Sequence, residues 1–222
     1  MIDAPSAVRA AVDRTLDAAV LAFESTYEVL GPPRFRGGGT GCCDLTVPVV
    51  RSEVTFDPGE MPGPSTSQPF VLHGRTLWMR LPGAEWEPVP VRGLAASDLV
   101  PLLWLRGTTS AAERPGEPGR YDVEADVATA AANSGPDLAA SLREDALADP
   151  PVDRLRGSVL VGDGGAGIVR EVDLVLLGET TQRMTLRLER TERCDVEVPV
   201  APAADVTGFT PPARVVPPPP PP

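Results

Sequence analysis

The chain has 222 residues, a hydrophobic content of 42% and a formal net charge of −11 at pH 7. This length and composition are typical of one globular domain with a single core. The acidic charge disfavours nucleic acids and anionic membranes, which both need a basic surface. All 20 basic residues are arginines, which excludes lysine-dependent chemistry such as a Schiff base or a P-loop.

The N-terminal part predicts a helix followed by a strand. Apolar residues recur at helical spacing over residues 6–18, and Ser6 is a suitable N-cap residue. From Val20 the apolar residues alternate with polar ones. This alternation predicts a strand, which Gly31 and the two prolines after it bring to an end.

Glycine and proline divide the segment that follows. Residues 34–43 are rich in glycine and predict a turn region. Residues 43–51 predict an edge strand, because Pro48 cannot donate a hydrogen bond within a sheet. Residues 53–57 predict a further strand, and residues 58–68 a loop.

The middle of the chain contains a hairpin signal and short helices. Residues 70–81 alternate in period two on either side of His73-Gly74, which predicts two short strands joined by a tight turn. Residues 97–105 predict a short helix and residues 108–118 a loop. A strand is then expected at 120–128, and a helix at 134–148.

The last third predicts an antiparallel meander with one apolar face and one polar face. Its four strands are expected at residues 154–161, 168–177, 182–190 and 193–200. The segment from Gly162 to Gly167 matches the G-x-G-x-x-G pattern, but the residues after it predict a strand instead of a helix. We therefore interpret this segment as a hairpin turn and not as a dinucleotide site. Residues 1–210 are expected to form one domain, followed by a disordered proline-rich tail at 211–222.

No group of residues forms a catalytic or metal-binding motif, so the sequence is interpreted as a non-enzyme without a cofactor or metal. His73 is the one histidine, and we expect it to be exposed at a ribbon tip. Cys42, Cys43 and Cys194 are odd in number and lack the spacing of a metal site. Reduced thiols are expected in a reducing compartment, and a strained disulfide between the adjacent Cys42 and Cys43 is the alternative.

Three passages, Leu72–Trp86, Gly119–Ala130 and Ile168–Val206, resemble parts of one protein family. They are similar to the hairpin, the strand entering the helical segment and the final meander of the LppX/LprG-type actinobacterial lipoprotein carriers, a group of LolA-like half-barrels. The resemblance implies an α+β fold in which a strongly curved antiparallel β-sheet (half-barrel) carries helices packed on its concave face. It also implies that lipid acyl chains are held between the sheet and the helices.

The first functional hypothesis is therefore a binding protein for a hydrophobic ligand, either a lipid or another apolar small molecule. Each CH2 group taken from water gains about 0.8 kcal/mol. The candidate lining consists of large apolar residues from the predicted strands: Leu21, Phe23, Phe56, Phe70, Leu72, Leu77, Met79, Val172, Leu174, Met184 and Leu186. These residues are equally consistent with a closed core, so the alternative is a half-barrel that binds a protein partner and no ligand.

The sequence also bears on location. It contains no apolar run long enough for a transmembrane helix, no secretory signal pattern and no usable lipidation cysteine. These features predict a cytoplasmic location for the chain as given. The cell envelope is expected if an export signal precedes it.

Overall fold

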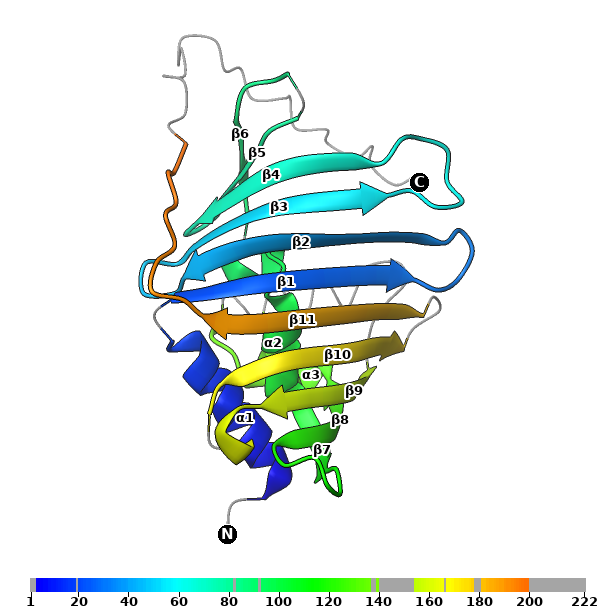
Figure 1. The fold of residues 1–222 in the computed structure, drawn as a ribbon, viewed down its shortest axis with the longest axis vertical. Helices are drawn as coiled ribbons and strands as arrows, with labels where there is room; N and C mark the ends of the chain where they lie inside the picture. Colours follow the sequence, from blue (N-terminus) through cyan, green and yellow to red (C-terminus); the bar gives the residue numbers. More distant parts are fainter. Residues whose placement is uncertain are drawn as a thin grey trace, which may run out of the picture.

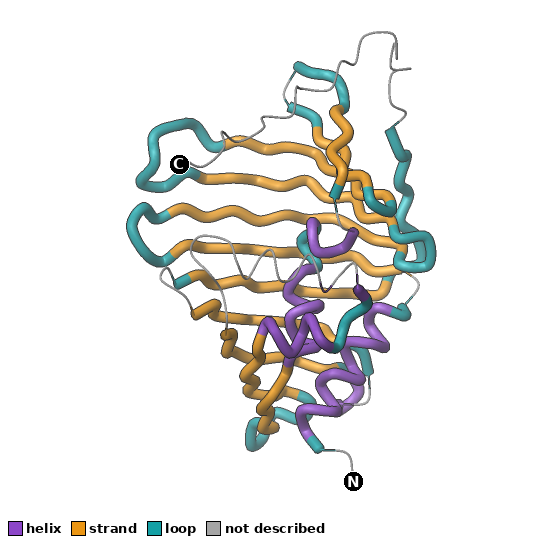
Figure 2. The backbone as a smooth tube through the Cα atoms, turned by 180° about the vertical axis from the view of Figure 1, so that it is seen from behind, coloured by secondary structure: helices purple, strands orange, loops and turns teal. Residues whose placement is uncertain are grey.

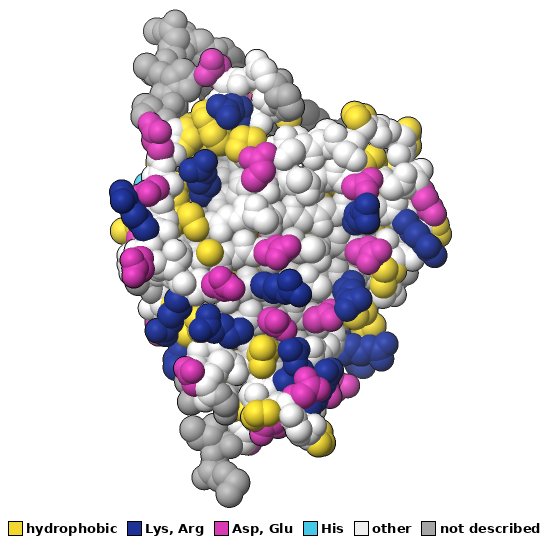
Figure 3. All heavy atoms as spheres, viewed as in Figure 1, with side chains coloured by type: hydrophobic (Ala, Val, Ile, Leu, Met, Phe, Trp, Pro, Cys, Tyr) yellow, Lys and Arg dark blue, Asp and Glu magenta, His cyan; other side chains and the backbone are white. Residues whose placement is uncertain are grey.

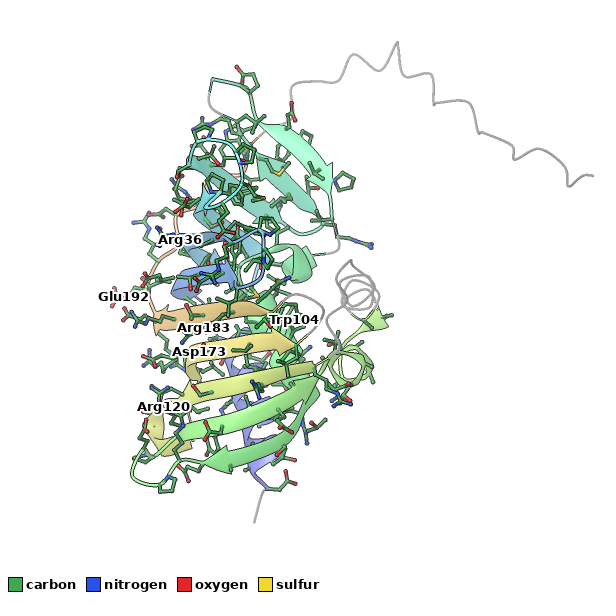
Figure 4. The ribbon with its side chains drawn as sticks, turned by 90° about the vertical axis from the view of Figure 1, so that its right-hand side faces the viewer. Arg36, Trp104, Arg120, Asp173, Arg183 and Glu192 are labelled. Atoms are coloured by element: carbon green, nitrogen blue, oxygen red, sulfur yellow. A yellow bond between two sulfur atoms is a disulfide. The ribbon has the colours of Figure 1, made fainter. Side chains whose placement is uncertain are left out.

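The computed structural model describes residues 3–18, 20–81, 83–91, 93–136, 139, 154–165, 167–177 and 181–199. Within these residues the chain forms one open antiparallel sheet of eleven strands, in the order β6-β5-β4-β3-β2-β1-β11-β10-β9-β8-β7 (Figure 1). The strands near both edges bend toward the side that carries the helices (Figure 4). The predicted curved α+β half-barrel is therefore confirmed.

Two meanders build the sheet. The first contains β1 (Val20–Val29), β2 (Phe35–Asp44), β3 (Val49–Asp57), β4 (Thr66–His73), β5 (Thr76–Met79) and β6 (Glu87–Pro90). The second contains β7 (Thr108–Glu113), β8 (Arg120–Asp126), β9 (Arg154–Val161), β10 (Val169–Leu177) and β11 (Gln182–Arg190). They join where β1 pairs with β11, with Phe23 opposite Leu188. The first and last strands are therefore neighbours in the middle of the sheet.

Short helices cover part of the inner face (Figure 2). Helix α1 (Ala4–Leu16) precedes β1, and α3 (Val127–Ala132) follows β8. The chain then passes from edge strand β6 to the opposite edge strand β7 through three short helical segments: η1 (Gly93–Ala96), α2 (Val100–Trp104) and η2 (Leu105–Gly107). Helix α1 contacts β7, β9 and β10, α2 contacts β10 and β11, and η1 reaches β4. No helix among the described residues is long and apolar enough to cross a membrane.

Helix α1 is fixed to the sheet by a buried hydroxyl group. The Thr15 hydroxyl donates to the Ala11 carbonyl at 2.6 Å and accepts from the Val169 backbone N–H at 2.8 Å. The N-cap is Asp3 and not Ser6 as predicted, because the Asp3 carboxylate accepts the Ser6 backbone N–H at 2.8 Å. The helix therefore begins two residues earlier than the sequence predicts.

The glycine-rich segment predicted as a turn is strand β2, which pairs with β1 and β3 along its full length. Its glycines make room for side chains of the neighbouring strand. A Cβ atom on Gly41 would lie 2.7 Å from Cζ of Phe23, and one on Gly37 would overlap the Tyr27 ring. The prediction of a turn was wrong because β2 forms through backbone pairing with β1 and β3, and its glycines have no side chains that would indicate a strand.

Three other boundaries also differ from the prediction. Residues 45–48 form a turn, so the edge strand expected at 43–51 is wrong and β3 lies inside the sheet. Residues 108–113 form edge strand β7 and not a loop. The strand expected at 120–128 ends at Asp126, whose carboxylate caps α3 through the Thr129 N–H at 2.6 Å. The helix expected at 134–148 lies mostly outside the described residues.

The cysteines and the last predicted strand also required correction. Cys42 and Cys194 form a disulfide, whereas Cys43 is a buried free thiol. The expectation of reduced thiols is therefore wrong for Cys42 and Cys194 and correct for Cys43, and the alternative of a Cys42–Cys43 bond is wrong. Residues 193–199 have no regular secondary structure, so the strand expected at 193–200 is wrong. The segment at His73-Gly74 is a turn between strands, as predicted, and His73 is exposed. The described residues between Gly162 and Gly167 connect β9 to β10 through a short 3-10 helix, η3 (Asp163–Gly165), so this segment is followed by a strand, as predicted.

The outer face of the sheet carries interspersed charges of both signs (Figure 3). Arg183 pairs with Asp173 at 2.7 Å, and Arg120 pairs with Glu171 at 2.8 Å. Arg183 and Asp173 lie on the adjacent strands β11 and β10, whereas Arg120 of β8 reaches across β9 to Glu171 of β10, so both ion pairs run across the sheet. This part of the outer face is therefore a solvated surface, and most of the buried apolar residues of the sheet lie on the inner face. Val71 and Trp78 are exceptions, because they lie in register with Arg51 and are buried outside the main core.

Candidate functional site

The inner face has a closed region, in which the sheet packs against the helices. Trp104 of α2 lies on this side of the sheet (Figure 4) and is 6% exposed. Five predicted lining residues are buried in this core, each exposed by 5% or less: Leu21, Phe23, Val172, Leu174 and Leu186. The structure thus places these five in the hydrophobic core.

A second region of the inner face forms a groove of about 220 Å3. Its floor is Val50, Ser52 and Leu72, which are at most 5% exposed. Its walls are half-buried and come from β3, β4, β5, β11 and the loop before α2: Val54, Phe70, Leu77, Ser97, Asp98 and Met184. Phe70, Leu72, Leu77 and Met184 are the predicted residues that the structure brings together here.

Strand register explains why these apolar residues meet. Leu72 lies opposite Val50 of β3 and Leu77 of β5, and Phe70 lies opposite Ser52. Residues opposite one another in an antiparallel pair point to the same face, so the three strands present a continuous apolar surface. Met184 arrives from the other meander because β11 pairs with β1.

Two further predicted residues, Phe56 and Met79, are half-buried but do not line the groove. Met79 lies opposite Phe70 in the β4–β5 register. The Phe56 ring lies 5.7 Å from the Phe35 ring, which is 6.3 Å from the Tyr27 ring, measured between centroids. Phe56 therefore belongs to an aromatic cluster at the far ends of β1, β2 and β3.

One end of the groove is polar. Asp98 lies in the loop between η1 and α2, and its Oδ1 accepts the Ser25 hydroxyl at 2.9 Å. The Ser25 oxygen in turn accepts the Gly39 backbone N–H at 3.0 Å. A Cβ atom on Gly39 would lie 3.1 Å from Oδ2 of Asp98. The Asp98 carboxylate thus occupies the space that a side chain at position 39 would fill.

Asp98 influences its neighbours electrostatically. Burial raises the pKa of the Tyr27 phenol above its ordinary value of 10.0, and the negative charge of Asp98 raises it further. Tyr27 is therefore a neutral phenol at physiological pH. Among the described residues that line the groove, Asp98 alone carries a charge.

Sequence reasoning did not identify Asp98, Ser97, Ser52, Val50 or Val54 as part of a site. Val50 and Val54 have the same alternation as the predicted residues, so their strand pattern contains a usable signal. Asp98 has no such signal, because its local sequence indicates only the start of a helix. It reaches the groove because the chain crosses from the first meander to the second at this point. Its placement depends on tertiary structure alone.

Four other hollows differ from this groove, because at least four charged residues line each of them. A hollow of about 640 Å3 on the outer face includes Arg114, Asp122, Asp173 and Arg183. These residues pair with one another, because Arg114 binds Asp122 and Arg183 binds Asp173, each at 2.7 Å. Within the described ranges no group of three or more His, Cys, Asp or Glu residues is arranged to hold a metal ion. The groove on the inner face is therefore the best candidate for an apolar ligand.

The fold is that of an open antiparallel half-barrel with helices on its inner side. No family model and no curated protein matches the chain. Among solved structures the chain is similar to the Mycobacterium tuberculosis lipoprotein LppX, with a TM-score of 0.47 and 11% sequence identity over 88% of this chain and 100% of that chain. It is also similar to a LolA-superfamily protein from Nitrosomonas europaea, with a TM-score of 0.37 and 10% identity over 89% of this chain and 96% of that chain. These are the groups that the sequence was found to resemble.

Proposed function

We propose that this protein is a non-enzymatic binding protein for a hydrophobic ligand, and that the groove on the inner face holds an acyl chain. The observation that carries the proposal is the half-burial of Val54, Phe70, Leu77 and Met184 around one groove. Elsewhere on the inner face, residues such as Leu174 and Leu186 are completely buried. A ligand chain would extend that burial to the groove and gain about 0.8 kcal/mol per CH2 group.

The size of the groove bears on the ligand. Its volume of about 220 Å3 exceeds the engineered apolar cavity of about 150 Å3 that holds benzene. It is smaller than the roughly 300–1,000 Å3 of sites for drug-sized ligands. The groove therefore suits a segment of one alkyl chain.

A location in the cell envelope accompanies this proposal. The Cys42–Cys194 disulfide supports it, because disulfides persist in oxidising compartments and are rare in the cytosol of mesophiles. This reading departs from the cytoplasmic expectation for the chain as given. It requires that the protein be exported.

The test is binding of N-phenyl-1-naphthylamine, an uncharged fluorescent probe, followed by its displacement with decanol. We expect saturable binding by the unmodified protein and loss of binding in Leu77→Trp, because the larger ring fills the groove. Leu81→Trp is the matched control, since Leu81 is 53% exposed and lies outside the groove. Thermal melts of all three proteins establish that they are folded.

Native mass spectrometry of the freshly purified protein supplies a second readout. Mass that co-purifies and extracts into organic solvent as lipid supports the proposal. A clean mass, together with no probe binding by the folded unmodified protein, would instead support an interaction module whose partner is another protein.

A further inference from the structure

We propose that Asp98 selects the polar end of the ligand, so that the groove accepts a chain ending in a hydrogen-bond donor, best of all an ammonium group, and rejects a chain ending in a carboxylate. This inference rests on the proposed function, because it specifies the chemical class of ligand for the same groove. Asp98 lines the groove and is half-buried there. It lies beside apolar residues that would hold the chain.

The acceptor capacity of Asp98 is the first argument. An ionised carboxylate has two oxygens and about four lone-pair sites, and it has no donor. The Ser25 hydroxyl donates to Oδ1 at 2.9 Å, which leaves capacity for a further donor. A ligand group that donates, such as a hydroxyl or an ammonium, matches this end of the groove, and an anionic group meets a like charge.

The charge balance of the groove is the second argument. Its described lining includes one carboxylate and no arginine. Sites that bind carboxylates or phosphates generally present arginine, lysine or a helix N-terminus. Such a positive group is missing from the described lining although the chain has 20 basic residues. Several of these lie instead on the outer face, in pairs such as Arg183–Asp173.

The fixed position of the carboxylate is the third argument. Ser25 is 5% exposed and holds Oδ1, while the absence of a side chain at Gly39 leaves room for Oδ2 against β2. The Ser97 hydroxyl accepts the Leu99 N–H at 3.3 Å and donates to the Leu94 carbonyl at 2.7 Å, which shapes the loop that presents Asp98. A preorganised acceptor discriminates between ligands better than a mobile one.

The test compares three ligands with the same alkyl chain, decylamine, decanol and decanoate, as competitors of N-phenyl-1-naphthylamine at pH 7. For the unmodified protein we expect affinity to fall in that order, with at least about a tenfold difference between the amine and the carboxylate. In Asp98→Asn, the amine loses about tenfold, the carboxylate gains a similar factor, and decanol changes little. Asp122→Asn is the matched control, because it removes the same charge from the outer face.

A second measurement uses the unmodified protein alone. Raising the salt concentration should weaken decylamine binding and leave decanol binding unchanged, because salt screens only the charged pair. The same ligand ranking in the unmodified protein and in Asp98→Asn would overturn the inference, as would salt-independent amine binding. If the uncharged probe itself does not bind the unmodified protein, the proposed function fails and the inference fails with it.

Discussion

Cys42 in β2 and Cys194 after β11 are joined by a disulfide that spans 152 residues of sequence. Adjacent residues of a strand face opposite sides, so Cys43 points inward and is buried while Cys42 meets the C-terminal segment outside. The Asp195 carbonyl also accepts a hydrogen bond from Nη1 of Arg51, at 3.4 Å. These two contacts hold the C-terminal segment against the outer side of β2 and β3.

Loss of this disulfide should destabilise the protein. For the double variant Cys42→Ser/Cys194→Ser we expect the free energy of unfolding to fall by ~2–4 kcal/mol, because the unfolded chain gains freedom when a long loop is opened. Urea denaturation under oxidising conditions measures this change. In reducing buffer the two proteins should unfold at similar urea concentrations. An unchanged midpoint for the double variant would contradict the prediction.

Thr15→Val should weaken the attachment of α1 to the sheet. The change keeps the side-chain shape but removes the hydroxyl that accepts the Val169 N–H. A buried N–H without a partner costs about 1–3 kcal/mol, and chemical denaturation should report a loss in this range. Thr26→Val is the control, since the Thr26 hydroxyl is exposed and meets Thr185 on the outer face. Equal effects of the two changes would argue against this role of Thr15.

Gly41→Ala should destabilise the sheet although it adds a single methyl group. The new Cβ atom would overlap the Arg51 carbonyl oxygen of β3 and would lie 2.7 Å from Cζ of Phe23. Overpacking of this kind costs about 1–3 kcal/mol. Gly135→Ala is the control, because a Cβ atom there has nothing within 4 Å. A thermal melt of Gly41→Ala that matches the unmodified protein would refute the prediction.

The stability of the protein should fall at alkaline pH through Cys43. Burial raises the pKa of this thiol from 9.0 to about 11. The folded protein therefore keeps the proton to higher pH than the unfolded chain. The protonated thiol's contribution to the free energy of unfolding is fully present below pH 9. It is lost at ~1.4 kcal/mol per pH unit as the pH rises toward 11.

Cys43→Ala isolates this effect. Tyr27 and Tyr121 also have raised pKa values, but they are present in both proteins and cancel in the comparison. The difference in the free energy of unfolding between the two proteins should be constant from pH 7 to about 8.5 and shrink above pH 9. A difference that does not vary with pH would show that this thiol does not titrate as expected.

Local sequence was sufficient to predict the strands whose faces are clearly apolar and polar. In β10, Val172 and Leu174 are buried while Glu171 and Asp173 face outward, which is the alternation that the sequence contains. Strand β2 could not be predicted in this way, because glycine lacks the side chain that would indicate which face is buried. Edge strand β7 is mostly exposed and has no strong apolar row.

The candidate site was predictable to a similar extent. The inward direction of Leu72 and Leu77 follows from the hairpin pattern, and the structure places both in the groove. The sequence did not distinguish the groove from the closed core, because Leu174 and Leu77 have the same local signal. The difference depends on which part of the sheet the helices cover, and that is a property of the whole fold.

The pairing of β1 with β11 also constrains how the protein is made. Among the described strands β1 is synthesised first and β11 last, so residues 182–190 complete the sheet. Until then β1 has an open edge with unpaired backbone groups, and such edges recruit strands from other chains. The chain is therefore most prone to aggregation while β1 waits for its partner, wherever folding takes place, and the pairing of β1 with β11 removes this open edge from the middle of the sheet.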